Sequence, residues 1–163
     1  MALPNVTGTV IAMGYNCHVR VGTNATDAQI IALVASFQAN EDFQAQEATC
    51  IGNLGPVSID PQGYTCSITL DGFLPSKKLS TGYYNSADKK AIAEFAPRRS
   101  EFMETGTVQK IEYLDFYDKK SGTVLAAFKG ALITSNGVSV DGNAYVRNNV
   151  QMRALSWEKD HWK

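Results

Sequence analysis

Few residues in this sequence could perform acid–base or nucleophilic chemistry. His18 and His161 are the two histidines, and histidine is the side chain whose unperturbed pKa lies near neutral pH. Cys17 precedes His18, and a thiol beside an imidazole is a combination that enzymes use for nucleophilic attack. In an extended strand, however, adjacent side chains point to opposite faces, so this pair cannot readily share a proton. The sequence therefore favours structural roles for both residues.

Sequence motifs with a defined catalytic mechanism do not occur. The chain has no G-x-S-x-G, P-loop, H-E-x-x-H or G-x-G-x-x-G pattern. Its cysteines, Cys17, Cys50 and Cys66, are odd in number, widely spaced and without a C-x-x-C pair, which argues against a zinc site or a disulfide framework. This cysteine usage fits a reducing compartment. We expect no enzyme activity, no cofactor and no metal site.

Length and composition set the broad class of the protein. A chain of 163 residues with 44% hydrophobic and 19% charged residues suits a single globular domain spanning 1–163. Fifteen basic and sixteen acidic residues give a net charge of −1, which disfavours tight binding to nucleic acid. Neither a signal peptide nor an apolar run of roughly 18 residues is present, so we expect no membrane anchoring.

Short strands separated by turns are predicted for the first half of the chain. The apolar run 30–37 fits a buried strand or a buried helix, and the alternation that follows it favours a strand. A hairpin turn at 40–42 is an alternative that would divide this alternation between two strands. Turn-forming residues occupy 52–56, and residues 64–71 alternate as a strand does. The polar members of the first alternation are Gln38, Asn40, Asp42, Gln44 and Gln46.

One short α-helix is predicted at about 86–96. Asn85 can cap its start, Asp88 would lie near the positive end of the helix, and Pro97 marks its end. Its apolar residues recur at helical spacing, which is typical of packing against a sheet. Residues 75–85 before it are predicted to form a loop, and residues 1–16 an N-terminal arm.

A meander of long strands is predicted for the last part of the chain. The strands span 107–117, 123–134 and 145–157, and the short turns between them imply antiparallel pairing. The last strand alternates apolar side chains with a polar, basic row: Arg147, Asn149, Gln151 and Arg153. The predicted fold class is thus mainly β, an antiparallel barrel or sandwich with one short α-helix.

Two stretches of the sequence share their order of strands and turns with a known family. The first comprises residues 33–37, 48–52, 56–57 and 63–68, and the second comprises 111–117, 122–125, 128–135 and 149–154. Together they resemble the tail tube proteins of bacteriophages and related contractile particles.

The resemblance implies a structural protein of the virion tail that assembles in the host bacterial cytoplasm. Tube subunits of this kind form hexameric rings whose inner strands join around a channel, and the rings stack into a tube that conducts DNA or an effector. The resemblance also implies contacts with sheath, baseplate and tail terminator proteins, and DNA that passes through without tight binding.

The two polar rows are the candidate functional surfaces. The row from Gln38 to Gln46 is neutral to acidic, as a lumen that must not bind phosphate requires, so we expect it to line the channel. The basic row from Arg147 to Arg153 is expected to contact a neighbouring subunit or a sheath protein. Residues 1–16 and 75–85 are candidates for contacts between stacked rings. A tail terminator and a monomeric β-barrel that binds a ligand are the alternative functions.

Overall fold

The computed structural model describes residues 14, 17–31, 34–52, 54–74 and 95–158. The predicted loop at 75–85 lies outside these ranges. So does the predicted N-terminal arm, apart from residue 14. No helix of the described residues has the length and apolar character needed to cross a membrane.

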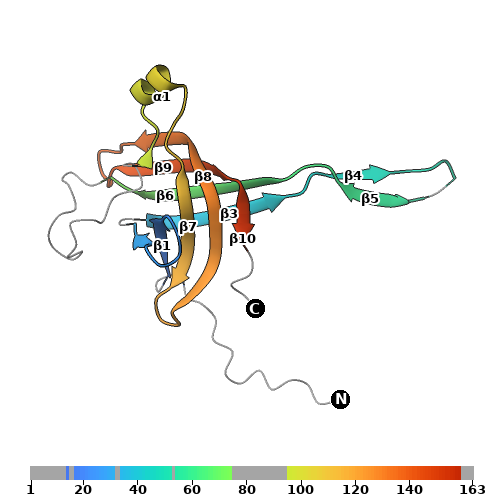
Figure 1. Ribbon diagram of the computed structural model, residues 1–163, viewed down its shortest axis with the longest axis horizontal. Helices are drawn as coiled ribbons and strands as arrows, with labels where there is room; N and C mark the ends of the chain where they lie inside the picture. The colour runs from blue at the N-terminus through green and yellow to red at the C-terminus, as the bar shows by residue number, and fades with distance from the viewer. Residues whose placement is uncertain (1–13, 15–16, 32–33, 53, 75–94, 159–163) are drawn as a thin grey trace, which may run out of the picture.

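Ten strands and one short helix make up the described structure (Figure 1). The strands are β1 Cys17–Gly22, β2 Gln29–Ile30, β3 Val34–Asp42, β4 Ala45–Ala48, β5 Ser58–Pro61, β6 Thr65–Phe73, β7 Ile111–Asp118, β8 Thr123–Ser139, β9 Arg147–Ala154 and β10 Ser156–Glu158. The prediction of a mainly β, antiparallel fold is confirmed.

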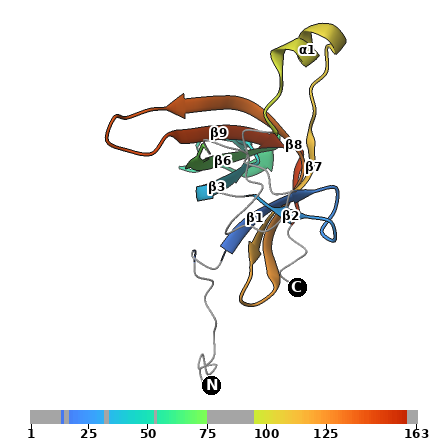
Figure 2. The same ribbon diagram turned by 90° about the vertical axis from the view of Figure 1, so that its left-hand side faces the viewer.

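The main sheet has the strand order β2-β1-β7-β8-β9-β6-β3, with β10 added beside β8. Every neighbouring pair is antiparallel. The first half of β8 pairs with β7 and its second half pairs with β9, so the sheet folds over on itself along β8 (Figure 2). It is an open, folded sheet whose two walls enclose the core, and it does not close into a barrel.

Aromatic and aliphatic side chains fill the space between the two walls. Phe37 of β3 stacks on Phe116 of β7 with ring centroids 5.2 Å apart, and it also meets Phe128 of β8 at 5.9 Å. Leu114 and Phe128 are completely buried. Burial alternates along β3, β6 and β9, so burying one face of these three strands commits their other face to solvent or to a partner.

Gly130 lies where β8 passes from one wall to the other. Its φ is +63°, a left-handed conformation that side-chain-bearing residues adopt at a cost. A Cβ atom added at this position would lie 2.6 Å from Leu155 Cδ1. The backbone conformation therefore favours glycine, and any larger residue would also require the exposed Leu155 side chain to move.

Gly130→Ala is expected to destabilise the protein by about 1–2 kcal/mol through the left-handed backbone alone, and further if Leu155 cannot move aside. Chemical denaturation measures this change. Gly142→Ala is the matched control, because nothing lies within 4 Å of a Cβ built at Gly142 and its φ is not in the left-handed range. Equal stability of the two variants would contradict this account of the bend.

The strands β4 and β5 form a hairpin that projects from the main sheet (Figure 1). It extends β3 and β6 beyond a break at Gln44, where φ is +46° and the backbone N–H donates to Asp42 Oδ1 at 2.9 Å. The alternative of a turn at 40–42 is wrong, because β3 continues through these residues and pairs with β6 as far as Asp42. The reversal of the chain lies between β4 and β5 instead.

The described helix, α1, spans Arg99–Thr105, after Pro97. Gly106 ends it with a φ of +67°, and its N–H donates to Phe102 O at 2.8 Å. Of the helix predicted at 86–96, residues 86–94 lie outside the described residues, and Phe95 and Ala96 are not α-helical. Among the described residues the fold thus has one helix, α1, and the helix at about 86–96 stays a prediction.

Candidate assembly surface

The polar side chains of four adjacent strands form one surface, which we call the polar face. Register places Gln38 of β3 opposite Thr69 of β6, and Thr69 opposite Gln151 of β9. Directly opposed residues in an antiparallel sheet point to the same side. The members of the polar face are Ser36, Gln38, Asn40 and Asp42 of β3, Thr65, Ser67, Thr69 and Asp71 of β6, Arg147, Asn149, Gln151 and Arg153 of β9, and Ser135, Gly137 and Ser139 of β8.

Both polar rows predicted from the sequence meet on this face. Gln38 and Gln151 flank Thr69, and Asn40 and Arg153 flank Ser67. Two surfaces to which the sequence assigned different environments are therefore one surface in the structure. Gln44 and Gln46 lie outside the polar face, because Gln44 sits at the break after β3 and Gln46 belongs to the β4–β5 hairpin.

Charges on the polar face balance. Asp42 and Asp71 are its acids, and Arg147 and Arg153 are its bases. Arg147 lies 3.5 Å from the Asp71 carboxylate and stacks over the Phe73 ring at 5.8 Å. Exposed pairs of this kind contribute little to stability. Their effect is to leave a hydrated surface of amides and hydroxyls with no excess of positive charge.

Asn148 fixes β9 against β8 from the opposite, buried side. Its side chain is almost completely buried, and its amide nitrogen donates to Asn136 Oδ1 at 2.6 Å and to Gly137 O at 2.9 Å. Buried amides that bond across two strands hold register. Asn148 therefore links β9 to residues 136 and 137 of β8.

The four-stranded wall that carries the polar face has two open edges among the described residues. Strand β3 pairs only with β6. Strand β8 pairs with β7 as far as Ala131, and beyond Ala131 that side of β8 has no partner. An unpaired edge exposes a row of N–H and C=O groups ready to bind another strand. These edges, at β3 and at residues 132–139 of β8, are candidate sites for pairing with another strand.

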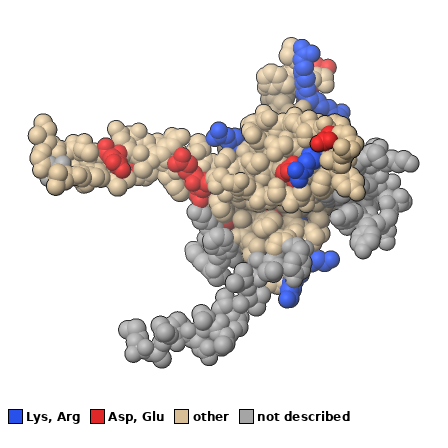
Figure 3. Space-filling model, turned by 180° about the vertical axis from the view of Figure 1, so that it is seen from behind, with Lys and Arg blue, Asp and Glu red and all other residues tan. Residues whose placement is uncertain are grey.

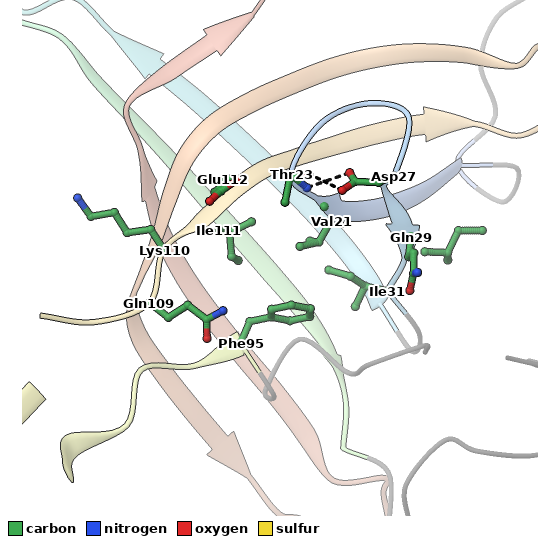
Figure 4. Close-up of a pocket in the computed structure, with 12 residues that line it drawn as sticks. Val21, Thr23, Asp27, Gln29, Ile31, Phe95, Gln109, Lys110, Ile111 and Glu112 are labelled. Atoms are coloured by element: carbon green, nitrogen blue, oxygen red, sulfur yellow. Dashed lines mark hydrogen bonds between the residues drawn. The ribbon is translucent and has the colours of Figure 1, made fainter. Parts of the chain in front are cut away.

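A hollow of about 470 Å³ lies on the other wall, between β1, β2 and residues 109–112 (Figure 4). Asp27 and Glu112 are its acidic residues, and Asp27 accepts hydrogen bonds from the backbone N–H groups of Thr23 and Asn24, each at 2.9 Å. The Thr23 hydroxyl and these N–H groups lower the pKa of Asp27. The carboxylate is thus occupied in closing its own loop, and no cluster of metal-binding side chains occurs among the described residues.

The Cys17–His18 pair predicted to be structural lies in β1, with Cys17 opposite Asp118 and His18 opposite Tyr117. Burial, followed by the nearby Asp118 carboxylate, raises the pKa of the Cys17 thiol. A nucleophilic cysteine needs the reverse, a lowered pKa that favours the thiolate. The arrangement does not activate this thiol.

Comparison with known proteins identifies the family. The family model described as Phi812 tail tube protein matches residues 16–158. The chain belongs to this family. The family prediction made from the order of strands and turns is confirmed, whereas a search of curated proteins found no match to this sequence.

Solved structures of other tail tubes share the fold of this tail tube family member. A chain in the tail of an empty gene transfer agent particle, refined with C6 symmetry, is 14% identical, with a TM-score of 0.56 over 91% of this chain and 98% of that one. A chain in the extended sheath–tube complex of the extracellular contractile injection system PVC is also 14% identical, with a TM-score of 0.58 over 97% of both chains. The SPP1 tail tube is 12% identical, with a TM-score of 0.57 over 90% of this chain and 77% of that one.

Two structural features of this tail tube family member had no clear signal in the sequence. The open edge at 132–139 was missed because the predicted strand ended at residue 134, while β8 continues to Ser139. The pairing of Arg20 with Asp115 was also missed. Arg20 donates to Asp115 through Nε at 2.9 Å and through its terminal nitrogen at 2.5 Å, and Tyr113 donates to the same carboxylate at 3.0 Å.

Proposed function

We propose that this protein is the structural subunit of a tail tube, which self-assembles into stacked hexameric rings and acts through its surfaces and not by catalysis. The observation that carries the proposal is the four-stranded wall with one buried face, one polar face and two open edges. Its family membership and the C6 symmetry of a similar particle support the same assembly.

The directions of the edge strands suit ring closure. Each step from β8 to β9, to β6 and to β3 is antiparallel, so β3 and the second half of β8 run in opposite directions. The β3 edge of one copy therefore meets the β8 edge of the next copy as another antiparallel pair. Because the two edges differ, the contact is heterologous, which generates a ring when the rotation closes. Closure also removes both edges from solvent.

The polar face then forms the inner wall of the tube. Neutral amides and hydroxyls with balanced charges give DNA phosphates no net positive surface to bind, so DNA or an effector can pass through. This proposal places both predicted rows, the one at 38–42 and the one at 147–153, on the lumen. In this function the protein resides in the virion tail, is assembled in the host cytoplasm, and meets sheath, baseplate and tail terminator proteins.

Electron microscopy of the purified protein over a range of concentrations tests the proposal. We expect long hollow tubes with sixfold end-on views. Protein that sediments as a monomer at every concentration would refute a tube and favour a ligand-binding β-barrel. Single rings that never lengthen would favour a tail terminator.

Proline substitutions in β8 test edge pairing directly. Successive residues of an antiparallel strand direct their N–H groups to opposite sides, so one of Gly137 and Val138 faces the open edge and the other faces β9. We test both Gly137→Pro and Val138→Pro. The variant that removes the N–H facing the open edge should keep its folded stability and lose polymerisation. Val140→Pro, just beyond the strand, is the matched control and should polymerise. Normal tubes from both strand variants would contradict closure through this edge.

A further inference from the structure

Asn136 and Gly137 of β8 form an Asn-Gly dipeptide, the only one in this sequence. Asparagine is a thermolabile residue, because the backbone nitrogen of the residue that follows it can attack its side-chain amide carbon. Glycine at the following position leaves that nitrogen unobstructed and lets the backbone rotate into the geometry of attack. The dipeptide therefore has the chemistry of a self-modification site.

The structure places this dipeptide on the open edge of β8. Both residues are exposed, and among the described residues β8 pairs with β7 only as far as Ala131. Residues 132–139 are therefore held by β9 alone. An extended strand keeps the glycine nitrogen away from the asparagine side chain, so the attack requires the strand to open locally. A strand bonded on one side opens at a lower free-energy cost than a strand bonded on both sides.

Asn148 of β9 holds both members of the dipeptide. Its Nδ2 donates to Asn136 Oδ1 at 2.6 Å and to Gly137 O at 2.9 Å. Negative charge develops on Asn136 Oδ1 as the glycine nitrogen attacks Cγ, and a hydrogen-bond donor at that oxygen stabilises the charge. Asn148 thus supplies a donor at the reacting carbonyl group.

We propose that Asn136 deamidates in the free subunit through attack by the Gly137 nitrogen, and that assembly prevents the reaction. A bond forms between the Gly137 nitrogen and Asn136 Cγ, the bond from Cγ to Nδ2 breaks, and ammonia leaves with the proton that the glycine nitrogen loses. Water then opens the resulting succinimide. Opening at Cγ gives aspartate, whereas opening at the backbone carbonyl carbon gives isoaspartate. The protection rests on the proposed tube, in which β3 of the next copy covers this edge.

Isoaspartate disrupts the edge that the proposed assembly uses. Its main chain runs through the former side chain and is longer by one atom, which moves residues 137–139 out of register with β9. The displacement of Gly137 O also breaks its hydrogen bond from Asn148. The Oδ1 atom of Asn148 is already buried without a hydrogen-bond partner among the described residues, so a further loss is costly.

Either product also places a charge on an uncharged strand segment. Residues 130–140 include no acidic or basic residue. On the side of the molecule that Figure 3 shows, charged groups are scattered over a mainly uncharged surface. A carboxylate at residue 136 therefore has no basic neighbour along this part of β8. Deamidation thus marks copies that stay unassembled and excludes them from growing tubes.

Peptide mapping of the protein kept as monomer and as tubes tests the proposal. The monomer is kept below the critical concentration for assembly, at mildly alkaline pH, because attack requires the amide nitrogen to lose its proton. We expect Asn136 to convert to aspartate and isoaspartate in the monomer, and at least about tenfold more slowly in tubes. Exposed Asn143, which precedes alanine, is the internal control and should convert little. Aged monomer should lose polymerisation in proportion to its isoaspartate content.

Gly137→Ala is the matched variant. A Cβ atom at this position would lie 3.7 Å from Asn149 O, which is an ordinary contact, and the φ of Gly137 is not in the left-handed range. The strand should therefore form and tubes should grow. The added methyl group hinders the attack, so conversion of Asn136 should slow at least about tenfold, and aged monomer of this variant should still polymerise.

The outcomes separate the chemistry from the tube function. If Asn136 converts no faster than Asn143 in the monomer, the modification site is overturned. Equal conversion in monomer and in tubes would overturn the protection by assembly. Tubes that incorporate the isoaspartate form at its full share would overturn its exclusion. A wild-type protein that never polymerises would overturn the tube function and the protection with it, while peptide mapping of the monomer alone decides whether Asn136 deamidates.

Discussion

Asp115→Ala is expected to destabilise the fold by about 3–5 kcal/mol, the largest stability effect that this structure predicts. Asp115 is completely buried and accepts two hydrogen bonds from Arg20, its direct cross-strand neighbour, and one from Tyr113. Burial and the nearby carboxylate raise the pKa of Tyr113, so its hydroxyl remains a donor. Removing the carboxylate would leave the guanidinium of Arg20, whose side chain is only 16% exposed, without this partner.

Chemical denaturation of three further variants separates the buried charge from the packing. Asp115→Asn keeps the size and should lose nearly as much, since the Arg20 charge stays unpaired. The double change Arg20→Met with Asp115→Leu should recover most of the loss, because no buried charge remains. Glu158→Gln breaks an exposed pair with Lys129 and should cost about 0–1 kcal/mol. A loss at Asp115 as small as that at Glu158 would contradict a structural role for the network.

Strands were predictable from the sequence where burial of one face enforces an alternation. Residues 65–73 alternate between buried and half-buried along β6, and residues 147–154 between exposed and buried along β9, as the pattern of residue types indicated. The neighbours of each strand were not predictable, because pairing depends on contacts between residues far apart in the chain. That is why the rows that contain Gln38 and Gln151 were treated as separate surfaces although only Thr69 lies between them.

The elements that project from the body gave weaker or misleading signals. The apolar residues of the β4–β5 hairpin have the composition of core strands, but Val57 and Ile59 are more than half exposed. Helix α1 has no buried face, so it lacks the periodic apolar stripe by which helices are recognised. A composition typical of core strands therefore does not by itself predict burial within the single chain.

Lysine substitutions on the polar face should convert a passive channel into one that holds DNA. In Gln38→Lys with Gln151→Lys, two positive charges per subunit would flank Thr69, and six subunits would repeat them around each ring of the proposed tube. Each phosphate that they neutralise releases counterions, so the affinity for single-stranded or duplex DNA should rise and its dependence on salt should steepen by about 0.7–0.9 per contact. Preassembled tubes titrated with labelled DNA at several salt concentrations give both quantities.

Two controls make the lysine test specific to the lumen. Gln38→Glu with Gln151→Glu changes the same positions without attracting phosphate, and Thr105→Lys adds a positive charge on exposed α1, away from the polar face. Tubes should assemble in all of these variants, because Gln38 and Gln151 lie on the hydrated polar face, Thr105 is exposed on α1, and none of the three side chains makes the backbone pairing that joins subunits. If the lysine and glutamate pairs both abolish assembly, the polar face is an interface between subunits. If Thr105→Lys tubes bind DNA as well as the lysine pair does, the polar face is not the lumen, and the balance of its charges has another cause.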